Sequence, residues 1–348
     1  MPSLVEISGR PLVDGFREVF GRRSNVLLRT RSQIRDELAA SVVTGLSRRP
    51  RALESRFLYD ERGSELYESI TRQPEYYLTR TEAALLRRHA GAIRDTTGPV
   101  TIIELGSGSA VKTQVLLGAY VEGGAAARYV PVDVSDAALV QAAADIEQHH
   151  PTVSVVSVHG TFETAIKLLG CVSPVMGVFL GSSIANLDED EERRFWARAA
   201  GEMKPGGFFL LGVDLVKAKQ RLDAAYDDAA GVTAAFTKNL FVRMNRELGA
   251  GLDVEAIAHE AEYVPERERV EIHARFRKAQ TLHVRPLKRR FRLSAGERVL
   301  VEISRKYRVE TLTPRLEAAG FGVRQVFTDP AKDFALLLLQ RSFREPER

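Results

Sequence analysis

Short apolar strands alternate with helical stretches over the middle of the chain. The sequence predicts strands over residues 101–105, 129–132, 153–158, 175–180 and 208–213, with helices over 110–121, 137–146 and 189–203. Strands that alternate with helices predict a mainly parallel sheet covered by helices on both faces, an α/β fold. Ligands of such sheets bind at the carboxyl ends of the strands, where functional residues are therefore expected.

The alternation breaks after Lys217. A helix is predicted over 232–247, and apolar and charged residues then alternate over 270–277, as in half-buried antiparallel strands. A helix over 310–319 leads into two strands that form a C-terminal antiparallel hairpin, 322–327 and 334–340. The chain is therefore expected to leave the parallel sheet for an insertion and to return to complete it.

Composition limits the class of protein. A chain of 348 residues with 44% hydrophobic residues suits two ordinary domains. The single cysteine, Cys171, cannot form an internal disulfide, so a reducing compartment and a cytoplasmic location are expected. No apolar run reaches the roughly 18 residues of a membrane span, and the N-terminus does not resemble a signal peptide.

Two classes of partner are not expected. The net charge is only +4, and short basic clusters are usually solvated surface, so no nucleic-acid partner is predicted. The seven histidines show no metal-ligand spacing, and one cysteine cannot build a thiolate zinc site, so no metal is predicted.

The first strand of the alternating region runs into a glycine-rich turn, "ELGSGSAVKT". Such a turn before a helix suits a nucleotide, because glycine lets the backbone approach the ligand and the first helical N–H groups point outward. The dinucleotide fingerprint needs a third glycine for close helix packing, and Val111 stands at that place. An NAD-dependent oxidoreductase is therefore disfavoured.

Two acids lie beside this turn. Asp133 ends the second strand, where a carboxylate can accept hydrogen bonds from both ribose hydroxyls of an adenosine, and Glu104 stands just before the glycines. Acids suit a ligand without phosphates and with positive charge, and S-adenosyl-L-methionine (SAM) has both properties. The alternative is that Glu104 and Asp133 only cap the helices that follow them.

Seven motifs carry a family resemblance. They occur in the order "FLYD", "PEYYLTRTE", "ELGSGSAVKT", "FLGSSIANL", "DLVK", "AYDDAAGVTAAF" and "VEISRKYR". Over roughly residues 35–340 the chain thereby resembles the histidine-specific Nα-methyltransferases of ergothioneine biosynthesis. The resemblance implies a SAM-dependent enzyme that methylates the α-amino group of L-histidine three times to hercynine and releases S-adenosyl-L-homocysteine.

The resemblance also implies two domains. One is a Rossmann-like class I methyltransferase sheet, and the other is an α+β substrate domain formed by the N-terminal segment and an insertion. The expected segments are 1–75 for the N-terminal helical part of the substrate domain, 76–218 for the methyltransferase domain, 219–305 for the inserted part of the substrate domain and 306–348 for completion of the sheet.

Site residues follow from the motifs and the acids. Thr161 replaces an acid of the family beside the adenine, and Ile272 replaces a methionine of its imidazole pocket. The expected cofactor residues are Glu104, Gly106, Lys112, Asp133, Thr161, Phe162, Gly181 and Ser182. The expected substrate residues are Tyr76, Asn186, Tyr226, Ile272, Glu302 and Ser304.

The chemistry asks mainly for positioning. Methyl transfer from a sulfonium is an in-line displacement, so the enzyme holds a neutral amine about 3 to 3.5 Å from the methyl carbon. Asn186 can orient that amine, Tyr59 or Tyr76 can relay its proton, and no essential general base is expected.

Glu302 and Ser304 are two residues apart on a predicted strand, so they face one side and can grip both imidazole nitrogens. The alternative is a surface pair between Glu302 and either Arg305 or Lys306.

Two other functions remain open from the sequence. One is Nα-methylation of another aromatic amino acid such as tryptophan, for which Glu302 would be expected to be an apolar or small residue. The other is a non-catalytic protein that binds the cofactor or the amino acid. A monomer is expected.

Overall fold

The computed structural model describes residues 3–7, 11–22, 25–30 and 34–343. The chain divides into two compact units. The first, called the sheet unit here, comprises Met1–Arg31, Leu78–Val216 and Tyr307–Arg348; the second, the insertion unit, comprises Ser32–Tyr77 and Lys217–Lys306. Parts of the expected segments 1–75 and 306–348, at residues 1–2, 8–10, 23–24, 31–33 and 344–348, lie outside the described residues.

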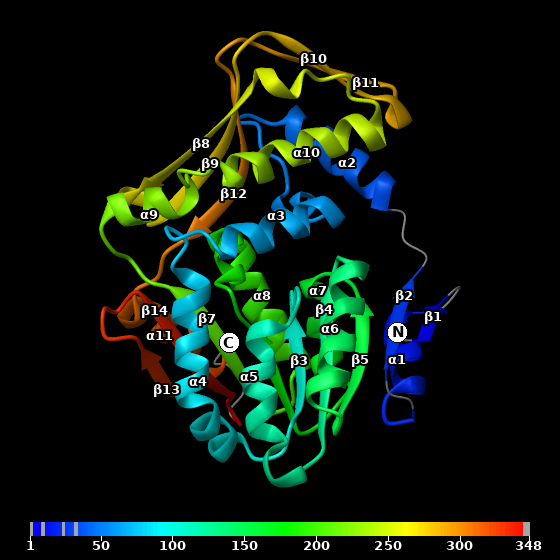
Figure 1. The fold of residues 1–348 in the computed structure, drawn as a ribbon, viewed down its shortest axis with the longest axis vertical. Coiled ribbons are helices and arrows are strands. Elements are labelled where there is room, and N and C mark those ends of the chain that lie inside the picture. Colours follow the sequence, from blue (N-terminus) through cyan, green and yellow to red (C-terminus); the bar gives the residue numbers. More distant parts are fainter. Residues whose placement is uncertain (1–2, 8–10, 23–24, 31–33, 344–348) are drawn as a thin grey trace. The chain divides into compact units, whose positions relative to one another are not determined.

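The sheet unit is built on one large sheet, seen in the lower part of Figure 1. Its neighbouring strands pair in parallel except at the two pairs that involve β14, which are antiparallel. The mainly parallel sheet and the C-terminal hairpin are thus confirmed. Within the described residues the strand order is β1 (Ser3–Ile7), β2 (Val26–Thr30), β5 (Val153–His159), β4 (Ala127–Asp133), β3 (Thr101–Leu105), β6 (Val175–Phe179), β7 (Phe208–Asp214), β14 (Phe334–Arg341) and β13 (Phe321–Thr328).

Helices cover both faces of this sheet. Because each central strand is shielded on both sides, its residues are apolar almost without interruption, and every residue of β3 is buried. One face packs on α1 (Leu12–Val19), α7 (Phe162–Leu169), α8 (Glu189–Glu202) and α11 (Val309–Ala318), which share a core with the strands. On the viewer's side in Figure 1 lie α4 (Leu78–Thr97), α5 (Val111–Tyr120) and α6 (Asp136–His149).

The N-terminal segment differs from the expectation. The sequence predicts that segment 1–75 is the helical part of the substrate domain, yet within it β1 and β2 extend the parallel sheet beside β5. Leu28 is fully buried and pairs with Val158, so burial of a short apolar strand at the sheet edge accounts for the placement. Among the described residues, the insertion unit therefore begins at Ile34, the first residue of α2 (Ile34–Ser47).

The insertion unit is α+β. Side chains of β9 are alternately half-buried and buried, as the period of two predicts. Its sheets are antiparallel, one of β12 (Arg298–Arg305), β9 (Arg269–Phe276) and β8 (Ile257–Val264), the other of β10 (Gln280–Val284) and β11 (Arg289–Leu293). Its α-helices are α2 (Ile34–Ser47), α3 (Glu61–Thr71), α9 (Lys219–Tyr226) and α10 (Val232–Leu248).

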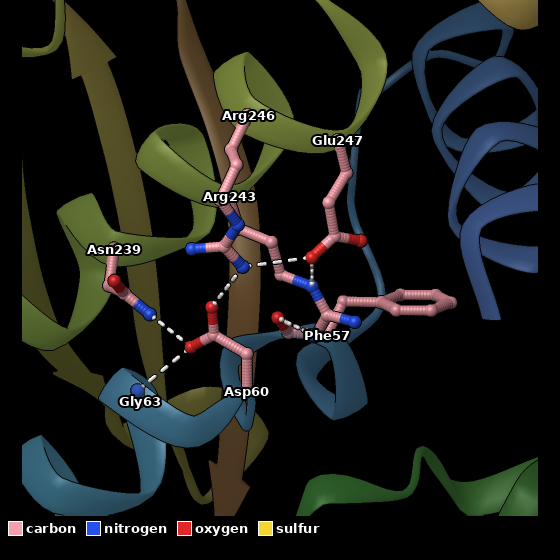
Figure 2. Close-up of polar contacts among 7 residues, drawn as sticks. All are labelled: Phe57, Asp60, Gly63, Asn239, Arg243, Arg246 and Glu247. Carbon is pink, nitrogen blue, oxygen red and sulfur yellow. Dashed lines mark hydrogen bonds and ion pairs between the residues drawn. The ribbon is translucent and has the colours of Figure 1, made fainter.

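The "FLYD" motif fastens α3 to α10 (Figure 2). Asp60 caps α3 by accepting a hydrogen bond from Gly63 N at 2.8 Å, and it also accepts from Asn239 Nδ2 and Arg246 Nη2, each at 2.7 Å. Burial alone would raise the pKa of Asp60, but these hydrogen bonds together lower it below its ordinary value. The network fixes the position of the preceding residue, Tyr59.

Among the described residues, no helix combines the length and the apolar character that crossing a membrane requires.

Candidate functional site

The glycine-rich turn is held against the end of β4. Gly106 N donates to the carbonyl oxygen of Val132 at 2.8 Å, and Gly108 N donates to Asp133 Oδ2 at 2.9 Å. The other Asp133 oxygen accepts from Ser135 N at 2.9 Å. Burial raises the pKa of the Asp133 carboxyl, and the backbone N–H groups of Gly108 and Ser135 oppose this rise. Asp133 is thus held in a defined position beside the turn.

Phe162 lies against the same turn. Gly106 has φ +67°, and a Cβ built on it would lie 3.1 Å from Phe162 Cε1, so a larger residue would strain the backbone and meet the ring. Phe162 begins α7 and its ring packs edge-on against Phe179, with centroids 4.7 Å apart. Thr161 is the residue before it, at the N-cap of α7. Three predicted cofactor residues, Gly106, Asp133 and Phe162, therefore gather at one end of the sheet.

Glu104 is buried and hydrogen-bonded to two residues of the sheet unit. Its carboxylate accepts hydrogen bonds from Thr113 Oγ1 at 2.6 Å and from the Tyr129 hydroxyl, which tie α5 to β3 and β4. Burial raises the pKa of Glu104 to about 7, although these two hydrogen bonds and the charge of Lys112 oppose the rise. A contact between Glu104 and the cofactor stays a prediction.

Glu82 on α4 is a candidate site residue that sequence reasoning missed. Its side chain is fully buried, pairs with Lys112 Nζ, and accepts from Gly181 N at 2.9 Å on both oxygens. A Cβ at Gly212 would lie 2.1 Å from Glu82 Oε1, so a larger residue there would displace the carboxylate. The signal was available, because Glu82 stands three and four residues before Leu85 and Leu86 on the buried face of its helix. Glu82 thus brings two predicted cofactor residues, Lys112 and Gly181, to one carboxylate.

The loop after β6 holds the remaining candidates of the sheet unit. Ser182 has φ +56°, uncommon for a residue with a side chain, and its Oγ accepts from Asp214 N at 3.0 Å. Asn186 ends the short 3₁₀ helix Ser183–Asn186 and is half-buried. The hydrogen bond from Asp214 N holds this loop at the carboxyl end of β6, where ligands of parallel sheets bind.

These residues fit SAM. The turn, the ring of Phe162 and the anchored Asp133 suit an adenosine, and the carboxyl groups of Glu82 and Glu104, which are buried in the same unit, suit a ligand that carries positive charge. The group would be held by Gly106, Asp133 and Phe162 at its adenosine end and by Lys112 at its carboxylate.

A bulge at Val301 decides which way the end of β12 faces. The register against β9 shifts by one residue there, so that Glu302 pairs with Ile272 and Ser304 with Val270. Directly paired residues of antiparallel strands share a face, and Ile272 and Val270 are buried. The prediction that Glu302 and Ser304 face one side is confirmed, and the bulge turns both toward the buried face.

Two hydroxyls and an ammonium meet beside that face. Tyr226 Oη and Ser304 Oγ are 2.7 Å apart, and Lys306 Nζ donates to them at 2.7 and 2.8 Å. The ammonium also lies 4.5 Å from the centroid of the Tyr226 ring. Lys306 and Arg305 are 3% and 7% exposed, so neither is the surface cation that the alternative for Glu302 assumed.

Aromatic rings continue from this cluster. The ring centroids of Tyr226 and Tyr76 are 6.1 Å apart, those of Tyr76 and Tyr67 are 6.5 Å apart, and those of Tyr67 and Tyr59 are 5.6 Å apart. Burial is the largest of the causes that hold the pKa of Tyr76 well above 10, so its hydroxyl stays protonated at neutral pH. The predicted substrate residues Tyr76, Tyr226, Ile272, Glu302 and Ser304 thus belong to the insertion unit, as Tyr59 does, whereas Asn186 belongs to the sheet unit.

Among the described residues, no group of three or more His, Cys, Asp and Glu side chains is arranged to hold a metal ion. The expectation of a reaction without metal stays a prediction.

Comparisons with known proteins identify the family of this chain. The family described as histidine-specific methyltransferase, SAM-dependent, matches residues 38–341. The histidine N-alpha-methyltransferase of Mycolicibacterium smegmatis is 41% identical over 88% of this chain and 95% of its own length. That of Mycobacterium tuberculosis is 40% identical over 86% of this chain and 94% of its own length. Ergothioneine biosynthesis protein 1 of Schizosaccharomyces pombe is 30% identical over 58% of this chain and 27% of its own length.

Proposed function

The chain belongs to the SAM-dependent histidine-specific methyltransferases, and from this premise we propose that it methylates the α-amino group of L-histidine. Three transfers give hercynine, an early intermediate of ergothioneine biosynthesis, and each releases S-adenosyl-L-homocysteine. The observation that carries the proposal is the family match, which spans both units and includes the motifs of both predicted sites.

The sheet unit holds the cofactor in this proposal. Asp133, fixed by Gly108 N and Ser135 N, accepts from the ribose hydroxyls, and Phe162 packs on the adenine beside Gly106. Thr161 supplies a hydroxyl to the adenine amino group in place of a carboxylate. SAM supplies an electrophilic methyl group when bound.

The insertion unit holds the histidine ring. Glu302 accepts a hydrogen bond from the imidazole N–H, and the Ser304 hydroxyl forms a hydrogen bond with the other ring nitrogen. Ile272 packs on the ring. A site built to hydrogen-bond a polar ring rejects analogues that lack it far more strongly than an apolar site rejects a missing methylene. The proposal therefore predicts selectivity for histidine over tryptophan.

The reacting amine needs orientation more than a strong base. Asn186 Oδ1 accepts from the amine and directs its lone pair toward the methyl carbon. Tyr76 stays protonated, so it can relay a proton through its hydroxyl but cannot act as a phenolate. Tyr59, placed by the Asp60 network, can extend this relay through Tyr67.

The proposal also covers the location of the enzyme, its oligomeric state and its partners. It works in the cytoplasm, as the single cysteine suggests, as a monomer, and without metal or nucleic acid. Gel filtration gives its mass in solution, and activity that survives a chelator is expected.

The direct test is to incubate the purified protein with L-histidine and SAM and to follow the amino acid by mass spectrometry. Successive gains of one, two and three methyl groups are expected, with the trimethyl product accumulating. L-tryptophan serves as the competing substrate. Faster methylation of tryptophan would identify a different substrate, and binding of histidine and SAM without turnover would identify a binding protein.

A further inference from the structure

The ammonium of Lys306 has an unusual position for a lysine. Lys306 is 3% exposed and follows β12, two residues after Ser304. Its Nζ donates to Tyr226 Oη at 2.7 Å and to Ser304 Oγ at 2.8 Å. Lysine side chains are almost never fully buried without partners, so the burial itself points to a defined role.

Hydrogen-bond counting shows what the ammonium does to the two hydroxyls. An ammonium has only donors, so Tyr226 Oη and Ser304 Oγ each accept one of its protons. The 2.7 Å contact between the two oxygens uses one hydroxyl proton. The second hydroxyl proton is therefore directed outside this group of three atoms, so the cluster of Tyr226, Ser304 and Lys306 acts outward as a hydrogen-bond donor.

Glu302 offers the opposite hydrogen-bonding character. It lies two residues before Ser304 on the same face of β12, and a carboxylate only accepts hydrogen bonds. A neutral imidazole has one N–H and one bare nitrogen, and it matches one acceptor and one donor. A doubly protonated imidazolium has two N–H groups, so one of them would face the hydroxyl donor and the Lys306 charge.

We propose that Lys306 is a positioning residue that fixes the Tyr226 and Ser304 hydroxyls as a hydrogen-bond donor, so that the site accepts only the neutral imidazole of its substrate. This rests on the proposed function, since it concerns the ring that Glu302 and Ser304 hold. Lys306 acts through the hydroxyls and needs no contact with the substrate itself.

Other titratable groups around Lys306 come from several elements. His259 Nε2 lies 2.9 Å from the Tyr226 carbonyl oxygen, and burial lowers the pKa of this histidine. Lys306 N donates to the carbonyl oxygen of Glu268 at 2.6 Å. The groups to be considered are Tyr226 on α9, Tyr76 beside it, His259 on β8, Glu268 before β9, and Glu302 and Arg305 on β12. All of them remain in a Lys306 variant, so a comparison of variant with wild type isolates the lysine.

The first test compares kcat/KM for L-histidine in Lys306→Met and wild type over pH 5 to 8. Met keeps the length of the side chain and removes the charge and the donors. At pH 8 the kcat/KM of the variant should be about tenfold below that of wild type, because its KM for histidine is higher, and its KM for SAM should be unchanged. Below about pH 6.5, the ordinary pKa of imidazole, the ratio of variant to wild type should rise by about tenfold per pH unit.

A matched control is Lys217→Met. Lys217 Nζ donates to Tyr77 Oη at 2.6 Å and lies 4.5 Å from the centroid of that ring, so it makes the same kinds of contact to a tyrosine without meeting Ser304. The ratio of its kcat/KM to that of wild type should not change with pH. A constant ratio for Lys306→Met, or an equal pH trend in both variants, would overturn the proposal.

The second test uses the wild type alone and therefore does not depend on the variant folding. Nα-Trimethyl-L-histidine has no proton on its α-nitrogen, so only its imidazole can lose one on binding. Calorimetry in buffers of different ionisation enthalpy, with S-adenosyl-L-homocysteine present, should show release of about one proton at pH 5.5 and none at pH 8. Binding without release at pH 5.5 would overturn the role of Lys306 while leaving histidine methylation intact. A wild type that neither binds this compound nor methylates histidine would overturn both proposals.

Discussion

The buried ionisable groups beside the two predicted sites differ in kind. In the sheet unit, Glu82 and Glu104 are buried carboxylates held by backbone N–H groups, hydroxyls and Lys112. In the insertion unit, the buried ion beside the predicted ring site is the Lys306 ammonium, held by two hydroxyls and a ring. A ligand with a sulfonium suits the first environment, and a neutral ring suits the second. The two predicted sites therefore differ in the ionisable groups that are buried beside them.

The largest effect is expected where a buried carboxylate of the sheet unit is removed. Glu82→Ala leaves Gly181 N and the Lys112 ammonium without this partner, and breaking a buried pair costs about 3 to 5 kcal/mol of the free energy of unfolding. Denaturant unfolding measures this loss. The control is Glu163→Ala, which removes an exposed pair with Arg198 and should cost under about 1 kcal/mol. Equal losses in the two variants would show that burial of the Glu82 charge does not matter.

The next effect concerns the pH dependence of stability. Glu104 has a pKa of about 7 in the folded protein and 4.5 as its ordinary value, so the folded state binds the extra proton between these pH values. The free energy of unfolding therefore falls as pH rises through this window, and Glu104→Gln removes the fall. As pH rises from 4.5 to 7.5, the free energy of unfolding of the variant should increase by about 3 kcal/mol relative to that of wild type. Denaturant unfolding of both proteins across this range checks it, and a difference that does not change with pH contradicts the assignment.

A smaller effect is expected at the ring site. Glu302→Ala leaves the imidazole N–H without an acceptor, which costs about 1 to 3 kcal/mol, or about 5- to 150-fold in kcat/KM for histidine. The KM for SAM should not change, because Glu302 belongs to the insertion unit. The control is Glu260→Ala, a carboxylate that pairs with Arg275 and lies across from His273 on the other face of the same sheet. Unchanged kinetics of Glu302→Ala would remove this residue from the site.

Local sequence patterns predicted much of the fold. Strands of the parallel sheet are buried on both faces, and a short run of apolar residues already shows this. Strand β9 is buried on one face, and its alternation of apolar and charged residues shows this equally locally. The segment "NVLLRT" is short and lies among helices, so its pairing with β5 depends on a strand about 130 residues away. Such a distant partner cannot be recognised from local periodicity.

For the candidate site, the sequence supplied the residue types and their order, because the spacing of motifs can be read along the chain without a structure. It determined that two acids flank a glycine turn and that Glu302 and Ser304 lie two apart on a strand. Only the tertiary structure decided that Val301 bulges, that Glu82 reaches Gly181 and that Lys306 is buried against Tyr226. The physical reason is that burial of a charge and the register of a strand depend on partners far away in the chain, and these partners become neighbours only when the chain has folded.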